Sequence, residues 1–323
     1  MTQQQLFERQ KWFVNLRFGQ FIHFSSGTVQ FADSPVKDWE DAHENCNQPR
    51  QYPFDPKDWN PAQLDCDQWA AASAAMGASF GCLTAKHHEG FCLWPTETTP
   101  HSVASATNKT DVVAAYLEAY RKAGLAAGLY FSTLDLTHKI GRKKCTPEDV
   151  EFTKQQLKEL LTRYGEIPFL VIDGWNAPWG GPVYEKLPFE ELDAFVKSIQ
   201  PECLILNHCC ETSLAHTDVV FYENAAGQEV EDGFVGPGAA GNILTNKNWF
   251  WRRGDDSAKL KSADWALQKI KEMNEKNVAF FLNASPNPQG LIDENMVARF
   301  REIGARYQKP APLEELPAGW LMR

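Results

Sequence analysis

The segment FGCLTAKHHEG, at residues 80–90, changes from apolar to ionisable residues within one short stretch. Its first residues favour a strand, and four ionisable side chains then follow in a row: Lys86, His87, His88 and Glu89. Such a row cannot continue a buried strand unless every member finds a polar partner. It is tolerated where a strand ends at the mouth of a barrel, because active-site loops begin there. We therefore interpret the segment as part of a functional site at a strand end.

Similar apolar runs recur along the chain, each short enough for a single strand. They are nearly continuous in hydrophobicity, as is typical of parallel strands that are covered on both faces. The runs lie at residues 18–24, 80–83, 126–131, 169–172, 203–206, 219–222 and 278–282, with 248–251 as a weaker candidate.

Helical signals fall between these runs. Asp65 and Gln68 have the spacing of a capping box, and Pro147 follows Thr146 at the favoured first position of a helix. The predicted helices cover residues 65–77, 110–124, 146–165, 264–276 and 293–307. Strands that alternate with helices over this length predict an α/β fold, a (β/α)8 TIM-like barrel. A doubly wound open sheet is the alternative, since the pattern alone fits both.

The chain of 323 residues contains no long linker or repeat, and its apolar content of 43% is ample for one large core. We expect a barrel domain over residues 1–308 and a C-terminal tail over 309–323. The segment GPGAAG at 236–241 satisfies GxGxxG, but it follows an acidic segment rather than a good strand. Because a dinucleotide site needs a strand–turn–helix context, we interpret this segment as a flexible loop.

Composition limits the partners of the chain. The net charge of -10 argues against a nucleic-acid partner, because phosphate binding requires a basic surface. No apolar stretch approaches membrane-spanning length, and the first residues, MTQQQLFERQKWF, lack the pattern of a secretory signal. The eight cysteines form no CxxC pair, and several lie in apolar runs. We therefore expect a cytoplasmic location and no membrane partner; the sequence does not indicate an oligomeric state.

Polar side chains stand at or just after most of the predicted strands. They are His23, Lys86-His87-His88, Tyr130, Asp173, Asn207-His208 and Glu223. In a barrel these positions converge on one face. Two carboxylates on strands two apart suit glycoside hydrolysis, in which one attacks the anomeric carbon and the other protonates the leaving oxygen. Histidines, Tyr130 and tryptophans would supply hydroxyl recognition and ring stacking.

Four further segments carry a resemblance to a known family. KHHEGFCLW (86–94), GLYFS (128–132), VIDGW (171–175) and NVAFFLNASPNPQGLIDE (277–294) look like glycoside hydrolase family 29, the α-L-fucosidases. WNPAQLDCDQWA (59–70) also resembles a segment of that family. The similarity runs from about residue 12 to about residue 307, and the order of the motifs is specific.

The resemblance implies a retaining exo-glycosidase that hydrolyses terminal α-L-fucosides through a covalent glycosyl-enzyme and needs no cofactor or metal. Asp173 matches the nucleophile of the family. Glu223 resembles the general acid/base, because it follows Asp218 by five residues. Glu211 and Glu229 are rivals for that second role. The expected partner is a fucosylated or related α-L-linked oligosaccharide.

The same resemblance implies a set of sugar-binding residues. Asp38-Trp39 corresponds to a Glu-Trp pair of the family, and Trp249 to an aromatic platform near the methyl group of the sugar. The implied binding residues are His23, Asp38, Trp39, His87, His88, Tyr130 and Trp249.

This chain departs from the family pattern at several positions. Phe24 replaces the tryptophan that usually follows the first histidine, and Glu89 replaces an aspartate. His208 or Cys209 stands where an arginine is expected. The β-sandwich domain that usually follows the barrel is not expected in this chain. These changes affect the expected substrate, because an apolar site discriminates only ~10²-fold against one added hydroxyl. An α-L-galactosidase on the same scaffold is therefore the first alternative.

Two other classes of protein remain as alternatives. A metal-dependent barrel hydrolase would use the histidines as ligands, but adjacent histidines on a strand point to opposite faces and no HxH motif occurs. A non-catalytic sugar-binding protein would not need both Asp173 and Glu223.

Overall fold

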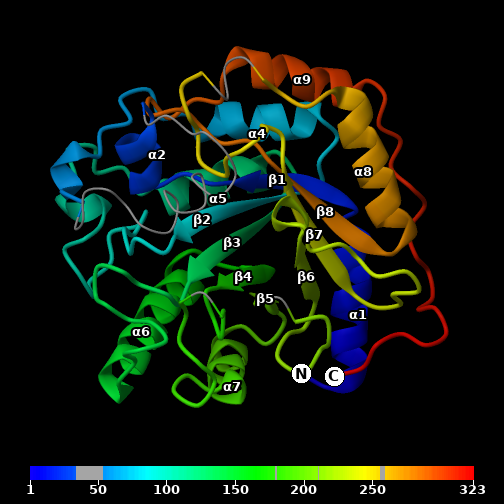
Figure 1. The fold of residues 1–323 in the computed structure, drawn as a ribbon, viewed down its shortest axis with the longest axis horizontal. Coiled ribbons are helices and arrows are strands. Elements are labelled where there is room, and N and C mark those ends of the chain that lie inside the picture. The colour runs from blue at the N-terminus through cyan, green and yellow to red at the C-terminus, as the bar shows by residue number, and fades with distance from the viewer. Residues whose placement is uncertain (34–53, 179, 210, 255–258) are drawn as a thin grey trace.

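The computed structural model describes residues 1–33, 54–178, 180–209, 211–254 and 259–323. Within these residues, eight strands form one sheet in the order β5-β4-β3-β2-β1-β8-β7-β6. All of the paired neighbours are parallel. Helices lie around the strands, with α4, α8 and α9 on one side and α6 and α7 on the other (Figure 1). The predicted (β/α)8-type barrel is confirmed.

The strands are β1 (Phe18–Ile22), β2 (Phe80–Lys86), β3 (Ala126–Ser132), β4 (Phe169–Asp173), β5 (Leu204–His208), β6 (Val220–Glu223), β7 (Gly238–Ile243) and β8 (Val278–Asn283). The α-helices are α1 (Gln3–Val14), α2 (Ser26–Phe31), α4 (Cys66–Ala75), α5 (Val112–Lys122), α6 (Pro147–Arg163), α7 (Phe189–Ile199), α8 (Ala263–Glu275) and α9 (Glu294–Gly304). Short 3-10 turns are η1 (Pro56–Asp58), η2 (Val103–Ser105) and η3 (Asn224–Ala226).

Two apolar layers follow from the alternation of side chains along each strand. Inside the barrel, Phe21, Val171 and Phe281 belong to one buried cluster, which α1 joins through Phe13. The Phe13 ring lies edge-on to Phe169, with ring centroids 5.3 Å apart, at the end of the barrel where the strands begin. The outward side chains of the same strands pack against the surrounding helices in a second buried cluster. The interior is therefore filled, and the strand ends opposite α1 are left to carry polar groups.

The local helix signals are largely confirmed. Thr146 and Asp149 form a complete capping box before α6, and Pro147 is its first residue. Asp65 accepts from the backbone N–H of Gln68 at 2.9 Å. The Gln68 side chain instead bonds to the backbone of Ile292, so this second capping box is only half formed.

The seam between β5 and β6 is held by side chains. Asp218, just before β6, accepts from the backbone N–H of Ile205 through Oδ2 at 2.8 Å. The Ile205 carbonyl in turn accepts from the backbone N–H of Asp218 at 2.8 Å. The Thr217 hydroxyl accepts from the backbone N–H of Asn207 at 2.9 Å. These bonds satisfy backbone groups of β5 on the side that faces β6.

The interpretation of GPGAAG as a flexible loop was wrong. Its last four residues open β7, which pairs with both β6 and β8. Gly238 is required because a Cβ atom there would lie 2.6 Å from Cγ2 of Val278. A Cβ at Gly241 would lie 3.2–3.4 Å from the rings of Phe221 and Trp249. Large neighbours thus supply the volume that the strand itself lacks, and packing overrides low strand propensity. The weaker candidate at 248–251 is correspondingly not a strand.

Residues 309–323 lie against α1, and both chain ends lie next to that helix (Figure 1). Trp320 is buried and donates from its ring N–H to Oε1 of Gln10 at 3.2 Å. Asn15 bonds to the backbone of Leu313 as both donor and acceptor. Among the helices of the described residues, none combines the length and apolar character needed to cross a lipid bilayer.

Candidate active site

One group of polar and aromatic side chains gathers at the carboxyl ends of the strands, and we call it the strand-end cluster. It comprises His23, His87, His88, Tyr130, Asp173, His208, Glu223 and Trp249. Trp249 lies in the segment after β7, and each of the other residues stands at, within or just after one of the six strands β1 to β6. Ring contacts, hydrogen bonds or ion pairs link every member to at least one other.

Asp173 ends β4 and is almost fully buried. Its Oδ2 accepts from the Tyr130 hydroxyl at 2.6 Å, and its Oδ1 accepts from the backbone N–H of Gly174 at 2.5 Å. Burial by itself raises the pKa of this carboxyl, but the nearby His208 and His88 rings and the Tyr130 hydroxyl outweigh it and hold the pKa well below its usual range. Asp173 is therefore an ionised carboxylate with fixed orientation.

Glu223 ends β6, and its carboxylate has two neighbours in the cluster. Oε1 accepts from the Trp249 ring N–H at 3.1 Å, and Oε2 lies 3.3 Å from Nε2 of His208. The Glu223 side chain keeps 16% of its surface exposed, against 8% for Asp173. Glu223 is thus the more accessible of the two carboxylates.

His208 ends β5 and lies between these carboxylates. Its Nδ1 is 3.3 Å from Oδ2 of Asp173, and its Nε2 is 3.3 Å from Oε2 of Glu223. Burial lowers the pKa of this imidazole, but the two carboxylates outweigh burial and raise the pKa well above its usual value. One imidazole ring therefore connects the two predicted catalytic groups.

His23 is held from behind by β8. Asn283 donates from Nδ2 to the Trp249 carbonyl at 2.7 Å, which turns its Oδ1 toward Nδ1 of His23, also at 2.7 Å. An amide oxygen only accepts, so this network assigns the proton of His23 to Nδ1 and leaves Nε2 as an acceptor. Burial and the nearby His87 lower the pKa of His23, so the ring is neutral.

His88 has a similar support. The Ser132 hydroxyl donates to the Leu134 carbonyl at 2.8 Å, so its oxygen accepts from Nδ1 of His88 at 2.7 Å. Nε2 of His88 lies 3.7 Å from Oδ2 of Asp173. The second ring nitrogen of this histidine therefore faces the carboxylate.

His87 lies between a carboxylate and aromatic rings. Its Nδ1 is 3.3 Å from Oε2 of Glu89, and its ring stacks on Tyr130 with centroids 5.4 Å apart at 10°. Ser26 donates to Oε1 of Glu89 at 3.2 Å. Burial raises the pKa of Glu89, but the nearby His87 ring and Ser25 hydroxyl outweigh burial, so the pKa is lowered. The glutamate that replaces an aspartate is thus an ionised support for His87.

Trp249 combines two contacts within the cluster. Its ring packs on His23 with centroids 4.9 Å apart, and its N–H reaches Glu223. Trp249 therefore connects the histidine side of the cluster with one of the two carboxylates.

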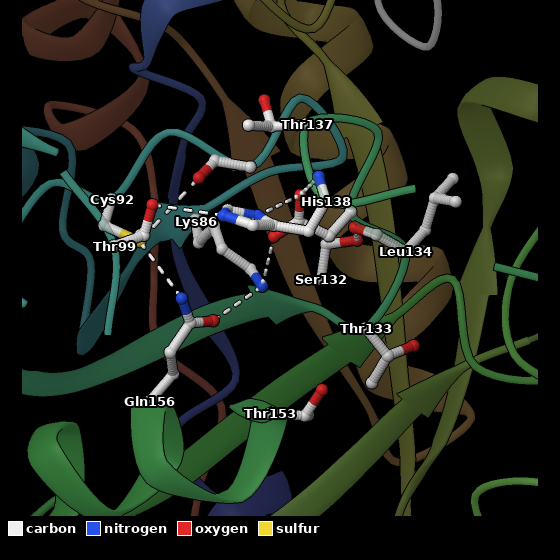
Figure 2. Close-up of polar contacts among 12 residues, drawn as sticks. Lys86, Cys92, Thr99, Ser132, Thr133, Leu134, Thr137, His138, Thr153 and Gln156 are labelled. Atoms are coloured by element: carbon white, nitrogen blue, oxygen red, sulfur yellow. Dashed lines mark hydrogen bonds and ion pairs between the residues drawn. The ribbon is translucent and has the colours of Figure 1, made fainter. Parts of the chain in front are cut away.

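Lys86 does not join the cluster, although it belongs to the same motif. Figure 2 shows its ammonium group directed toward Gln156 of α6. Lys86 Nζ donates to Oε1 of Gln156 at 2.8 Å and pairs with Oδ2 of Asp135 at 3.3 Å. Both ionic partners are buried, and His138 lies 2.9 Å from the other oxygen of Asp135. This network connects β2 to α6 and to the loop after β3, so Lys86 supports the motif from outside the barrel.

The rivals for the role of Glu223 have other surroundings. Glu211 lies 2.9 Å from Nδ1 of His216 and accepts from the Tyr184 hydroxyl at 3.1 Å. Glu229 is exposed. Asp218 is fully buried and pairs with Lys197 at 2.7 Å. Glu223 is thus the carboxylate, among these, that shares an imidazole with Asp173.

Two predicted binding residues, Asp38 and Trp39, lie outside the described residues. Within the described ranges, no group of three or more His, Cys, Asp or Glu side chains is placed to hold a metal ion.

The sequence alone did not indicate the roles of His208, Asn283 and Ser132. His208 was predicted at a strand end, and the available signal was that His208 or Cys209 stands where the family has an arginine. Asn283 and Ser132 are the last residues of β8 and β3, so a search for polar residues at every strand end would have found both.

Comparisons with known proteins show the family and the fold of this chain. The family profile described as Alpha-L-fucosidase matches residues 1–309. Alpha-L-fucosidase 1 of Arabidopsis thaliana is 30% identical over 304 residues, which cover 88% of this chain and 56% of that protein. The chain thus spans little more than half the length of this relative.

Solved structures share the fold. Unliganded alpha-L-fucosidase AlfC from Lactobacillus casei has a TM-score of 0.76 at 18% identity, with coverage of 92% of this chain and 97% of that one. An alpha-L-fucosidase GH29 from Bacteroides thetaiotaomicron, trapped as a covalent intermediate with 2-fluoro-fucosyl fluoride, has a TM-score of 0.72 at 22% identity. The match covers 92% of this chain and 73% of that one. On the family match over nearly its whole length, the chain belongs to the α-L-fucosidase family.

Proposed function

We propose that this protein is a retaining exo-glycosidase that hydrolyses terminal α-L-fucosides. The observation that carries the proposal is the placement of Asp173 and Glu223 on opposite nitrogens of the His208 ring. Two carboxyl groups that flank a scissile bond are the basic requirement of glycoside hydrolysis.

Asp173 is the proposed nucleophile. A nucleophilic carboxylate must be ionised and aimed, and the lowered pKa of Asp173 and its bonds from Tyr130 and Gly174 support both. In the first step an oxygen of Asp173 bonds to the anomeric carbon while the bond from that carbon to the leaving oxygen breaks. The product of this step is a glycosyl ester on Asp173.

Glu223 is the proposed general acid/base. It gives its proton to the leaving oxygen in the first step and becomes a carboxylate. It then takes a proton from water, whose oxygen attacks the anomeric carbon and releases Asp173. Its greater exposure supports this role, because the water must reach it.

The histidines are proposed to bind the hydroxyls of the sugar. Nδ1 of His23 is held by Asn283 and Nδ1 of His88 by Ser132, so each ring has a fixed orientation. Trp249 offers an aromatic face beside them. The GH29 structure with a trapped covalent intermediate belongs to a protein of the same fold, and it supports a glycosyl-enzyme in this chain.

The test uses 2-fluoro-fucosyl fluoride as a trapping reagent. Intact mass should rise by one fluorofucosyl group, and peptide mapping should place that group on Asp173. We expect Asp173→Asn to remain unlabelled and to lose turnover by about 10³-fold or more. Labelling of another carboxylate, or a product of inverted configuration in the first minutes of reaction, would contradict the proposal.

The substrate is tested with two aryl glycosides. We expect turnover of the α-L-fucoside to exceed that of the α-L-galactoside; the opposite order would identify an α-L-galactosidase on the same scaffold. A loss of turnover with EDTA that metal restores would instead support the metal-dependent alternative.

A further inference from the structure

His208 has an arrangement that the double-displacement scheme does not by itself require. Both of its ring nitrogens face a carboxylate oxygen at 3.3 Å, on Asp173 and on Glu223. Its ring also packs on Phe221 of β6, with centroids 4.5 Å apart, and the side chain is buried. A neutral imidazole has only one N–H, so one of the two carboxylates would then face a lone pair. Only the imidazolium, with a proton on each nitrogen, presents positive charge to both.

The proposed reaction moves negative charge from one of these carboxylates to the other. Before the first step the charge is on Asp173, and Glu223 carries a proton. After it, Asp173 is a neutral ester and Glu223 is a carboxylate. A cation placed between the two lies next to the negative charge in both states, without any movement of the protein.

We propose that His208 is a positioning residue that acts as a cationic bridge, holding Asp173 and Glu223 in place and balancing the charge that passes between them. This inference rests on the proposed function. Turnover then depends on the protonation of a residue that forms no covalent bond with the substrate.

Other titratable groups surround the ring. From β2 and β3, His88 and Tyr130 approach the same Oδ2 of Asp173, at 3.7 Å and 2.6 Å. His23 from β1 lies close enough for its pKa to be lowered by His208. On the β5 side, Glu211 is already paired with His216.

The direction of the pH effect follows from these neighbours. Burial lowers the pKa of His208, but Asp173 and Glu223 outweigh burial and raise the pKa well above its usual value. The bridge is therefore intact at neutral pH and is lost as the pH rises through this raised pKa. Turnover should decline on the alkaline side.

Glu223 is the proposed general acid/base, so the test removes its carboxyl group. In the Glu223→Gln variant, an aryl α-L-fucoside with a highly acidic leaving phenol needs no general acid, and kcat/KM reports attack by Asp173 alone. We expect Glu223→Gln to keep an alkaline decline in kcat/KM. The double variant Glu223→Gln/His208→Arg should lose this decline, because arginine stays charged across the range.

A neutral bridge provides the matched comparison. Glu223→Gln/His208→Gln should show a kcat/KM about 10²-fold lower than that of Glu223→Gln. This kcat/KM should be independent of pH on the alkaline side. The same alkaline decline in all three variants would overturn the inference, because the decline would then come from another group.

A second measurement needs no turnover. Nitrogen-15 NMR of histidine-labelled protein should show one ring, absent in His208→Gln, that titrates above the ordinary value near 6.5 and shifts to lower pH in Asp173→Asn. If the wild-type protein cleaves no fucoside but its His208 ring still titrates in this way, the proposed function is contradicted while the inference about the bridge stands. A His208 ring that titrates at or below the ordinary value would exclude the bridge.

Discussion

At the scale of single residues, the strand-end cluster is built from pairs in which one side chain fixes another. Asn283 assigns the proton of His23, and Ser132 assigns that of His88. Tyr130 fixes the Asp173 carboxylate, because its hydroxyl donates to Oδ2 at 2.6 Å from within the barrel. The chemistry of each proposed group thus depends on a neighbouring side chain that holds it in place.

Tyr130→Phe tests this dependence. Loss of the donor should raise the pKa of Asp173, and since Asp173 must be ionised to attack, the acid limb of kcat/KM should move to higher pH. We expect kcat/KM to fall by about 10- to 10²-fold at neutral pH. The pH profile on an aryl α-L-fucoside measures both effects.

Tyr116→Phe is the matched control, since Tyr116 is also a buried tyrosine but donates to the Gly128 carbonyl at 3.1 Å. Its variant should cost about 1 kcal/mol of stability and leave the acid limb in place. An acid limb that does not move in Tyr130→Phe would mean that the hydroxyl does not support the carboxylate.

At the scale of elements, β7 is the strand whose packing is decided by its neighbours. Gly238 faces Val278 of β8, and Gly241 faces two aromatic rings. The strand can therefore pair on both sides only while these positions have no side chain.

Gly238→Ala should lower the free energy of unfolding by about 1–3 kcal/mol, because the new methyl group overlaps Cγ2 of Val278. Chemical denaturation followed by tryptophan fluorescence measures the change. Gly27→Ala, in the helix α2, is the control. The atoms nearest to a Cβ at Gly27 lie 3.6–3.7 Å away, which is ordinary van der Waals contact. We expect this control to be neutral or slightly stabilising, and equal stability of the two variants would contradict the packing argument.

At the scale of the whole molecule, the barrel is closed between β5 and β6 largely by Asp218. This buried carboxylate binds the backbone of Ile205, pairs with Lys197 at 2.7 Å and receives Arg323 at 2.5 Å. The seam lies below His208 and Glu223, which end the same two strands. Closure of the barrel and alignment of the cluster therefore depend on one group.

Asp218→Ala should destabilise the protein by about 3–5 kcal/mol, because it leaves Lys197 without its closest carboxylate and exposes the seam. It should also lower kcat on an aryl α-L-fucoside. Asp193→Asn is the control, since Asp193 also pairs with Arg323, at 2.6 Å, but lies on α7. Its variant should change stability by less than about 1 kcal/mol. An Asp218→Ala protein as stable as the control would rule out this role for the seam.

Much of the fold was predictable because it depends on local sequence patterns. Apolar runs such as 169–172, and caps such as Thr146, depend on residues that are neighbours in sequence. β7 was missed for the opposite reason. Its glycines and alanines have little preference of their own, and the volumes that make them suitable belong to Val278, Phe221 and Trp249.

The sequence by itself determined the alternation of strands and helices and the position of polar residues at strand ends, because hydrophobic periodicity and chain chemistry are local properties. It also carried the family motifs. Only the tertiary structure decided how these residues act on one another. Asn283 meets His23 across 260 positions of the chain, and His208 meets both carboxylates only because β4, β5 and β6 converge. Such contacts depend on strand order and barrel closure, which no local pattern encodes.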